Sequence, residues 1–180
     1  MLQQSLPGFC PLAAAVEVLA SAGVEERGAV FTRGEVVDFI LDLSGYTADK
    51  PLHEARLLEP SFGDGDFLLR AIDRLLTSYK NHGGKMPERD LARSICGVEL
   101  HHATFEKSKA AVISFLGERG IASRDAQGLA NAWLHQGDFL LAELDGSWDY
   151  VVGNPPYVRQ ELIPQVLIDE YRRRVLSVKR

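Results

Sequence analysis

Four short apolar segments alternate with segments of helical period along this chain, and no other feature constrains the possible folds as strongly. The apolar segments are 55–58, 94–99, WLHQGDFL at 133–140 and WDYVVG at 148–153. Strands that alternate with helices form parallel sheets joined by right-handed crossovers. The sequence therefore predicts an α/β fold in which helices flank a parallel sheet.

Helical spacing predicts the remaining elements. We expect helices at about 11–22, within the segment 31–45, and over about 66–80, 101–119 and 125–132. Thr32 and Glu35 have the spacing of a capping box, and Gly45 suits a helix C-cap. Residues 1–54 are expected to form an N-terminal helical segment, and 55–180 the core built on the sheet.

Composition bounds the class of protein. The chain has 180 residues, 46% of them hydrophobic, and no apolar run approaches the roughly 18–20 residues of a membrane span. Cys10 and Cys96 have neither a metal-site spacing nor a disulfide framework, and Cys96 lies in an apolar run that predicts a buried thiol. The net charge is −5, although five basic residues and no acid occupy 172–180, either as a phosphate contact or as a solvated helix end. We expect a reduced, cytoplasmic protein with no metal and no membrane partner.

Polar or glycine-bearing turns follow all four predicted strands, where parallel sheets bind ligands. In the first turn, Gly63 and Gly65 let the backbone approach a ligand at a helix N-terminus. Acidic residues in that turn, among them Glu59, disfavour a pyrophosphate and favour a cationic ligand. Glu99 ends the second strand, where a carboxylate can accept from both ribose hydroxyls, and Asp138 follows the third, where it can accept from an amine such as that of adenine. Together these features describe a site for S-adenosylmethionine, although each alone also fits an ordinary turn or exposed acid.

The fourth turn, Asn154–Tyr157, reads Asn-Pro-Pro-Tyr and is expected to lie beside the first. Its two prolines fix φ and remove two amide donors, which stiffens the turn. The side-chain oxygen of Asn154 and the carbonyl of Pro155 can accept both protons of a planar, conjugated NH₂ group, which localises the nitrogen lone pair for attack on a methyl group. The ring of Tyr157 offers a face on which a planar substrate can stack. The alternative is a rigid turn with a surface tyrosine.

The segments EPSFGDGDFL, GVE, GDFL and NPPYVRQE resemble, in order and spacing, the methyltransferases that act on adenine N6 in DNA, especially the type IIG or Eco57I-like restriction–modification branch. FTRGEVVDFILDL resembles the N-terminal cofactor motif of that family, so the resemblance covers roughly residues 29–165. It implies a Rossmann-like methyltransferase fold that binds S-adenosylmethionine through Phe31, Thr32, Glu59, Pro60, Gly63, Gly65, Glu99 and Asp138. It also implies that a flipped adenine of double-stranded DNA contacts Asn154, Pro155, Pro156 and Tyr157.

Three departures from the family pattern matter. Arg33 stands where the family has proline, which alters the approach to the cofactor, and Phe62 and Asp66 replace smaller residues, which we expect to affect packing more than binding. The chain ends at Arg180, whereas the family continues with strands that complete the sheet and a target-recognition region. We therefore expect a fragment, or a subunit that needs a complementary partner.

Two alternatives to a DNA adenine methyltransferase stay open. Methyltransferases that modify a glutamine side chain of a protein, at N5, also use Asn-Pro-Pro-Tyr, there on a carboxamide. The chain can also be a non-catalytic piece that at most binds the cofactor. The FTRGEVVDFILDL helix and the Val-Arg-Gln-Glu continuation favour the DNA family.

Overall fold

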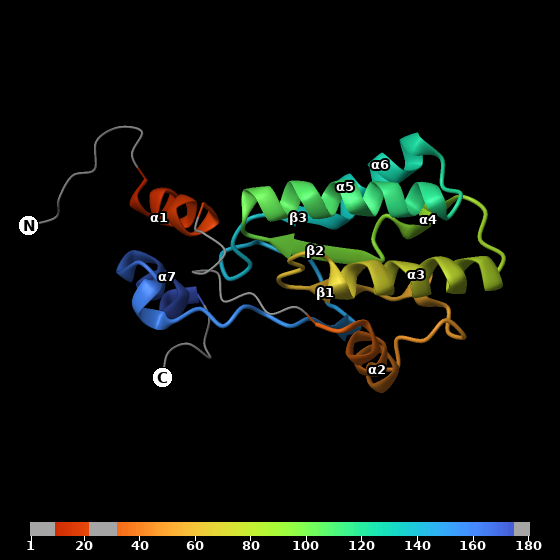
Figure 1. The fold of residues 1–180 in the computed structure, drawn as a ribbon, viewed down its shortest axis with the longest axis horizontal. Coiled ribbons are helices and arrows are strands. Elements are labelled where there is room, and N and C mark those ends of the chain that lie inside the picture. The colour runs from red at the N-terminus through yellow and green to blue at the C-terminus, as the bar shows by residue number, and fades with distance from the viewer. Residues whose placement is uncertain (1–9, 22–31, 175–180) are drawn as a thin grey trace, which may run out of the picture.

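A parallel four-stranded sheet in the order β3-β2-β1-β4 forms the centre of the computed structural model, which describes residues 10–21 and 32–174 (Figure 1). The strands are short and lie where the apolar segments predict them: β1 Leu57–Glu59, β2 Ile95–Glu99, β3 Leu134–Gln136 and β4 Tyr150–Val151. The predicted α/β class and the parallel sheet are confirmed. The predicted neighbourhood of the first and fourth strands is also confirmed, since β4 pairs with β1.

Seven α-helices and two 3₁₀ helices occur in the described part of the chain: α1 Pro11–Ala20, α2 Gly34–Ser44, α3 Asp66–Asn81, α4 Pro87–Leu91, α5 His102–Glu118, α6 Ser123–Trp133, α7 Gln165–Arg174, η1 Leu52–Glu54 and η2 Gln160–Leu162. The five helices expected from periodicity are confirmed to within a few residues. The short helix α4 was not predicted, because it begins at a proline behind a glycine pair, a pattern that indicates only a chain break.

Helices cover one face of the sheet, and a loop covers the other. The main core lies on the helical face, where residues such as Leu57 and Ile95 of the strands pack against α2, α3, α5 and α6. On the opposite face, Leu58, Cys96 and Val98 are covered by the connection between β3 and β4, through Phe139, Leu144 and Trp148. Burial raises the pKa of the Cys96 thiol to about 11, in agreement with the predicted buried thiol. Among the described residues, the apolar side chains on this face of the sheet are therefore covered by a loop.

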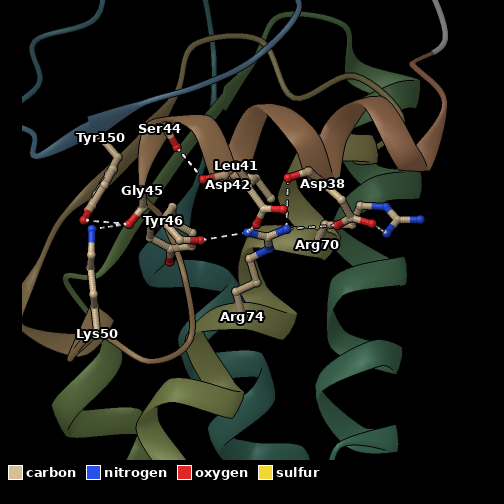
Figure 2. A network of polar contacts seen from close by, with 10 residues as sticks. All are labelled: Asp38, Leu41, Asp42, Ser44, Gly45, Tyr46, Lys50, Arg70, Arg74 and Tyr150. Atoms are coloured by element: carbon tan, nitrogen blue, oxygen red, sulfur yellow. Dashed lines mark hydrogen bonds and ion pairs between the residues drawn. The ribbon is translucent and has the colours of Figure 1, made fainter.

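A network of polar contacts centred on Arg74 holds α2 against α3 (Figure 2). The Arg74 guanidinium donates to the carboxylate of Asp42 at 2.5 Å and to the carbonyls of Tyr46 and Asp38 at 3.0 Å each. At the end of α2, Gly45 has the predicted left-handed C-cap conformation, with φ 77°. Its carbonyl accepts from the hydroxyl of Tyr150 in β4 at 3.4 Å. Helix α2 and its C-cap are therefore fixed to both α3 and β4.

We expect Arg74→Ala to lower the free energy of unfolding by about 2 kcal/mol, because it removes the guanidinium donor of the Tyr46 carbonyl and the ion pair with Asp42. Such a loss corresponds to a fall in Tm of roughly 4–8 °C for a chain of this size. Arg70 is the matched control: it lies one turn earlier on α3 and pairs with Asp38, but its side chain is 44% exposed against 17% for Arg74. Arg70→Ala should cost at most about 1 kcal/mol. Thermal and urea denaturation measure both, and equal losses would contradict the assignment.

Candidate active site

The glycine loop and the Asn-Pro-Pro-Tyr turn follow neighbouring strands at the carboxyl edge of the sheet, because β4 pairs with β1. Gly153, the residue before the turn, has φ 149°, and a Cβ built on it would lie 3.5 Å from Cγ of Glu59 and 3.8 Å from Cδ of Pro60. The backbone that follows β4 thus passes close to the side chain of Glu59, the last residue of β1. The structure brings together the two motifs to which the sequence assigns cofactor and substrate.

The loop between β1 and α3 needs its glycines. Gly63 and Gly65 have φ of 50° and 89°, conformations that side chains rarely adopt. A Cβ built on Gly63 would meet no atom within 4 Å, so the backbone there is open to an approaching group. The loop is nevertheless held in place, since the Gly63 carbonyl accepts from the Ser108 hydroxyl at 2.7 Å. These features suit a loop that approaches a ligand with its backbone.

Glu99 is buried, and its carboxylate is hydrogen-bonded to two backbone amides. Its side chain lies in a residue only 3% exposed, so the reading of an ordinary surface acid does not apply. One carboxylate oxygen accepts from the amide of Gly63 at 2.9 Å, and the other accepts from the amide of His101 at 2.8 Å. Each carboxylate oxygen has two lone pairs, so both can accept a further donor such as a ribose hydroxyl.

Glu59 is buried at the end of β1. The residue is 1% exposed, and within the described part of the chain its Oε2 has no hydrogen-bond partner. Burial raises the pKa of this carboxyl well above its usual range, and the negative charges of Asp66 and Glu99 raise it further. An unpartnered buried carboxylate is costly, and a cation placed against it would remove that cost. The buried carboxylate of Glu59 therefore fits the positively charged end of S-adenosylmethionine.

Asp138 is engaged by a residue that the sequence did not point to. Its Oδ1 accepts from the amide of Leu140 at 2.9 Å, and its Oδ2 accepts from the hydroxyl of Tyr171. Tyr171 belongs to α7, which packs against α1 beyond the carboxyl edge of the sheet, at the left of Figure 1. Burial, and then the Asp138 carboxylate, raise the pKa of Tyr171. The helix pair α1–α7 thus lies over the residue expected to bind the adenine of the cofactor.

The predicted capping box at Thr32 and Glu35 is wrong. Helix α2 begins at Gly34, its N-cap is Arg33, and no side chain caps it. Thr32 instead has two tertiary partners: its amide donates to Oδ2 of Asp66 at 2.9 Å, and its hydroxyl accepts from Nδ2 of Asn154 at 3.2 Å. Thr32 therefore makes tertiary hydrogen bonds in place of the predicted helix cap.

The two departures from the family pattern in the glycine loop have different outcomes. Asp66, which was expected to affect packing, accepts a hydrogen bond from a backbone amide of another segment. Phe62 does pack, against Phe105 and beside Gly97.

The remaining predicted residues divide by exposure. Pro155 and Pro156 are exposed, and Tyr157 is 71% exposed, so its ring is available to a large ligand. Phe31 lies outside the described residues.

Over residues 10–21 and 32–174, no cluster of three or more histidine, cysteine or acidic side chains is placed to hold a metal ion. None of the helices in this part of the chain is long and apolar enough to span a membrane.

Comparison with known proteins gives consistent matches. The chain is 59% identical over 167 residues to the Type II methyltransferase M.PaeR7I of Pseudomonas aeruginosa, which covers 92% of this chain and 29% of that protein. It is 50% identical over 152 residues to M.XhoI of Xanthomonas vasicola, covering 83% of the chain, and 43% identical over 158 residues to M.BstVI of Geobacillus stearothermophilus, covering 84%. Both of these are also named Type II methyltransferases, and the match spans 28% of each.

The chain therefore spans less than a third of the length of these relatives. A family model described as Eco57I restriction-modification methylase matches residues 68–179, which is more than half of the chain. That match includes β2, β3 and β4 and the Asn-Pro-Pro-Tyr turn. The chain belongs to the Eco57I restriction-modification methylase family.

Proposed function

We propose that this chain supplies the cofactor-binding and base-binding parts of a restriction–modification methyltransferase that transfers a methyl group from S-adenosylmethionine to N6 of adenine in DNA. The observation that carries the proposal is the proximity of Gly153, which leads into Asn-Pro-Pro-Tyr, to Glu59 and Pro60: a Cβ built on Gly153 would lie within 4 Å of both side chains. This proximity supports a site in which acceptors for an amino group lie beside a buried acid suited to a cation. The names of the relatives support the same class of activity.

The cofactor would supply an electrophilic methyl group on a positively charged sulfur, and residues of three strand ends would hold it. Glu59 would face its positive end, since this carboxylate is buried and its Oε2 has no hydrogen-bond partner among the described residues. Glu99 would accept from the ribose hydroxyls and Asp138 from the adenine amine, while Gly63 and Gly65 would allow close backbone approach. Phe31, Thr32 and Pro60 complete the proposed set.

The Asn154–Tyr157 turn would hold the target base. Oδ1 of Asn154 and the carbonyl of Pro155 would accept the two N6 protons, so that the nitrogen lone pair leaves conjugation with the ring. The nitrogen would then form a bond to the methyl carbon as the carbon–sulfur bond breaks, and one proton would leave the nitrogen for solvent. The exposed ring of Tyr157 would stack on the flipped adenine, a contact worth about 1–3 kcal/mol for a base on an aromatic side chain.

Recognition of double-stranded DNA would require a further polypeptide segment, on a complementary subunit or on more of the same chain. Among the described residues, β4 lies at the edge of the sheet with no strand on its outer side. Val151 of β4 is in register with Leu58, on the face covered only by a loop, and is exposed. An open parallel edge with an exposed valine suits the addition of further strands.

Two measurements test the proposal. Calorimetric titration with S-adenosylmethionine should give binding, and an absence of binding would remove cofactor function for this chain. Labelled methyl groups should then appear as N6-methyladenine in mixed-sequence DNA, read by mass spectrometry, when the complete protein is used. A release-factor-type protein serves as the competing substrate. Label on its glutamine, with none on DNA, would favour the glutamine methyltransferase instead.

A further inference from the structure

We propose that Thr32 is a positioning residue, whose hydroxyl fixes the side-chain amide of Asn154 with its oxygen turned toward the target amino group. The proposal rests on the proposed methyl transfer and adds to it a role for a residue otherwise expected to contact the cofactor. The observation behind it is the hydrogen bond from Nδ2 of Asn154 to Oγ1 of Thr32, at 3.2 Å across 122 positions of sequence.

The orientation of this amide decides whether it can act. A primary amide carries an acceptor oxygen on one side and a two-proton donor on the other, and rotation by half a turn exchanges them. A substrate NH₂ group needs acceptors, so an inverted Asn154 would point two protons at two protons. Since the Thr32 hydroxyl takes the Nδ2 end, the Oδ1 end is left for the substrate.

Thr32 can hold the amide in the observed orientation because its own position is fixed from two sides. Its amide donates to Oδ2 of Asp66, the first residue of α3, at 2.9 Å. The helix that follows Thr32 is held on α3 by Arg74 and reaches β4 through the Tyr150 hydroxyl (Figure 2). Asn154 follows β4 closely in sequence, so donor and acceptor are both carried by elements that the same network ties together.

The contact itself can be observed in this chain by NMR. The sequence contains three asparagines, Asn81, Asn131 and Asn154, so selective ¹⁵N-asparagine labelling gives three side-chain NH₂ pairs. Asn154→Asp assigns the pair of interest by removing it. Thr32→Val, which keeps the shape and loses the hydroxyl, should move the Asn154 pair and leave the other two in place. Thr32→Ser should return it close to its wild-type position. An Asn154 pair unmoved by Thr32→Val would overturn the proposal.

The consequence for catalysis is measured on the complete methyltransferase with the same variants. Thr32→Val should lower kcat about tenfold, while KM for DNA changes by less than twofold and cofactor binding weakens by clearly less than the loss in kcat, and Thr32→Ser should keep at least half of kcat. A Thr32 that only contacts the cofactor would instead weaken cofactor binding by the factor lost in activity, and that result would overturn the proposal, as would an unchanged kcat. If the wild-type enzyme transfers no methyl group to DNA, the proposed function fails, whereas the NMR comparison still decides the contact. Thermal denaturation of both variants checks that each is folded.

Discussion

Replacing Asn154 with alanine is expected to lower the rate constant for methyl transfer by about 10²- to 10³-fold and to leave the affinity for S-adenosylmethionine within about twofold of wild type. The size of the loss is that of removing one preorganised hydrogen-bonding group from charge that develops in a transition state. The amide of Asn154 would accept a proton of the nitrogen that becomes the nucleophile, an interaction that strengthens only as the reaction proceeds. The residues proposed to bind the cofactor lie at other strand ends, so cofactor binding should survive.

Single-turnover methylation and calorimetry separate the two effects. Asn131→Ala is the matched control, since Asn131 is an exposed asparagine on α6 whose side-chain oxygen accepts from Gln127 of the same helix at 3.3 Å. It should alter neither quantity. A parallel loss of methyl transfer and cofactor affinity in Asn154→Ala would place Asn154 in the cofactor site and remove it from the substrate site.

The parts of this architecture that the sequence predicted are those that local pattern determines. Short apolar runs separated by helical periods were enough for the parallel sheet, because each element carries its own periodicity. The convergence of Glu59, Glu99 and Asn154 on one edge followed from the topology alone, since parallel strands end on the same side. Glycine at 63 and 65 pointed to a backbone conformation that the structure has.

The parts that could not be predicted depend on contacts between distant segments. Thr32 has every local feature of a helix cap, and only the fold brings Asp66 and Asn154 to it. Tyr171 lies just before a basic tail that reads as a solvated helix end, yet its hydroxyl donates to Asp138 of another loop. In each case the polar side chain satisfies its hydrogen bonds through tertiary partners that no spacing rule indicates.

Glu59→Gln is expected to weaken S-adenosylmethionine binding about 10²-fold at pH 8, because it removes the buried negative charge from the proposed site of the positive group. Truncating one partner of a buried charge pair costs about 2–5 kcal/mol, and 10²-fold corresponds to about 2.7 kcal/mol. Since burial, Asp66 and Glu99 raise the pKa of Glu59, wild-type affinity should also fall as the pH is lowered and this carboxyl is protonated. The affinity of Glu59→Gln should vary much less with pH.

The same substitution, although it should weaken cofactor binding, should stabilise the cofactor-free protein. A carboxyl whose pKa is higher in the folded than in the unfolded state binds more protons when folded, so folding stability falls as the pH rises above the unfolded pKa. Glutamine carries no such penalty. Glu59→Gln should therefore unfold at a higher temperature than wild type at pH 8, by roughly 2–12 °C for a buried polar group worth about 1–3 kcal/mol, and the difference should shrink toward pH 5.

Thermal denaturation and calorimetry at several pH values test both directions on one pair of proteins. Glu118→Gln is the control, since Glu118 is an exposed carboxylate at the end of α5 that accepts from the hydroxyl of Ser114, on the same helix, at 3.3 Å. It should change neither Tm nor cofactor affinity. A buried acid with a purely structural role would lose stability on substitution and leave affinity unchanged. Higher stability with weaker binding is the signature of a site in which the uncompensated charge of Glu59 is kept for a cationic ligand.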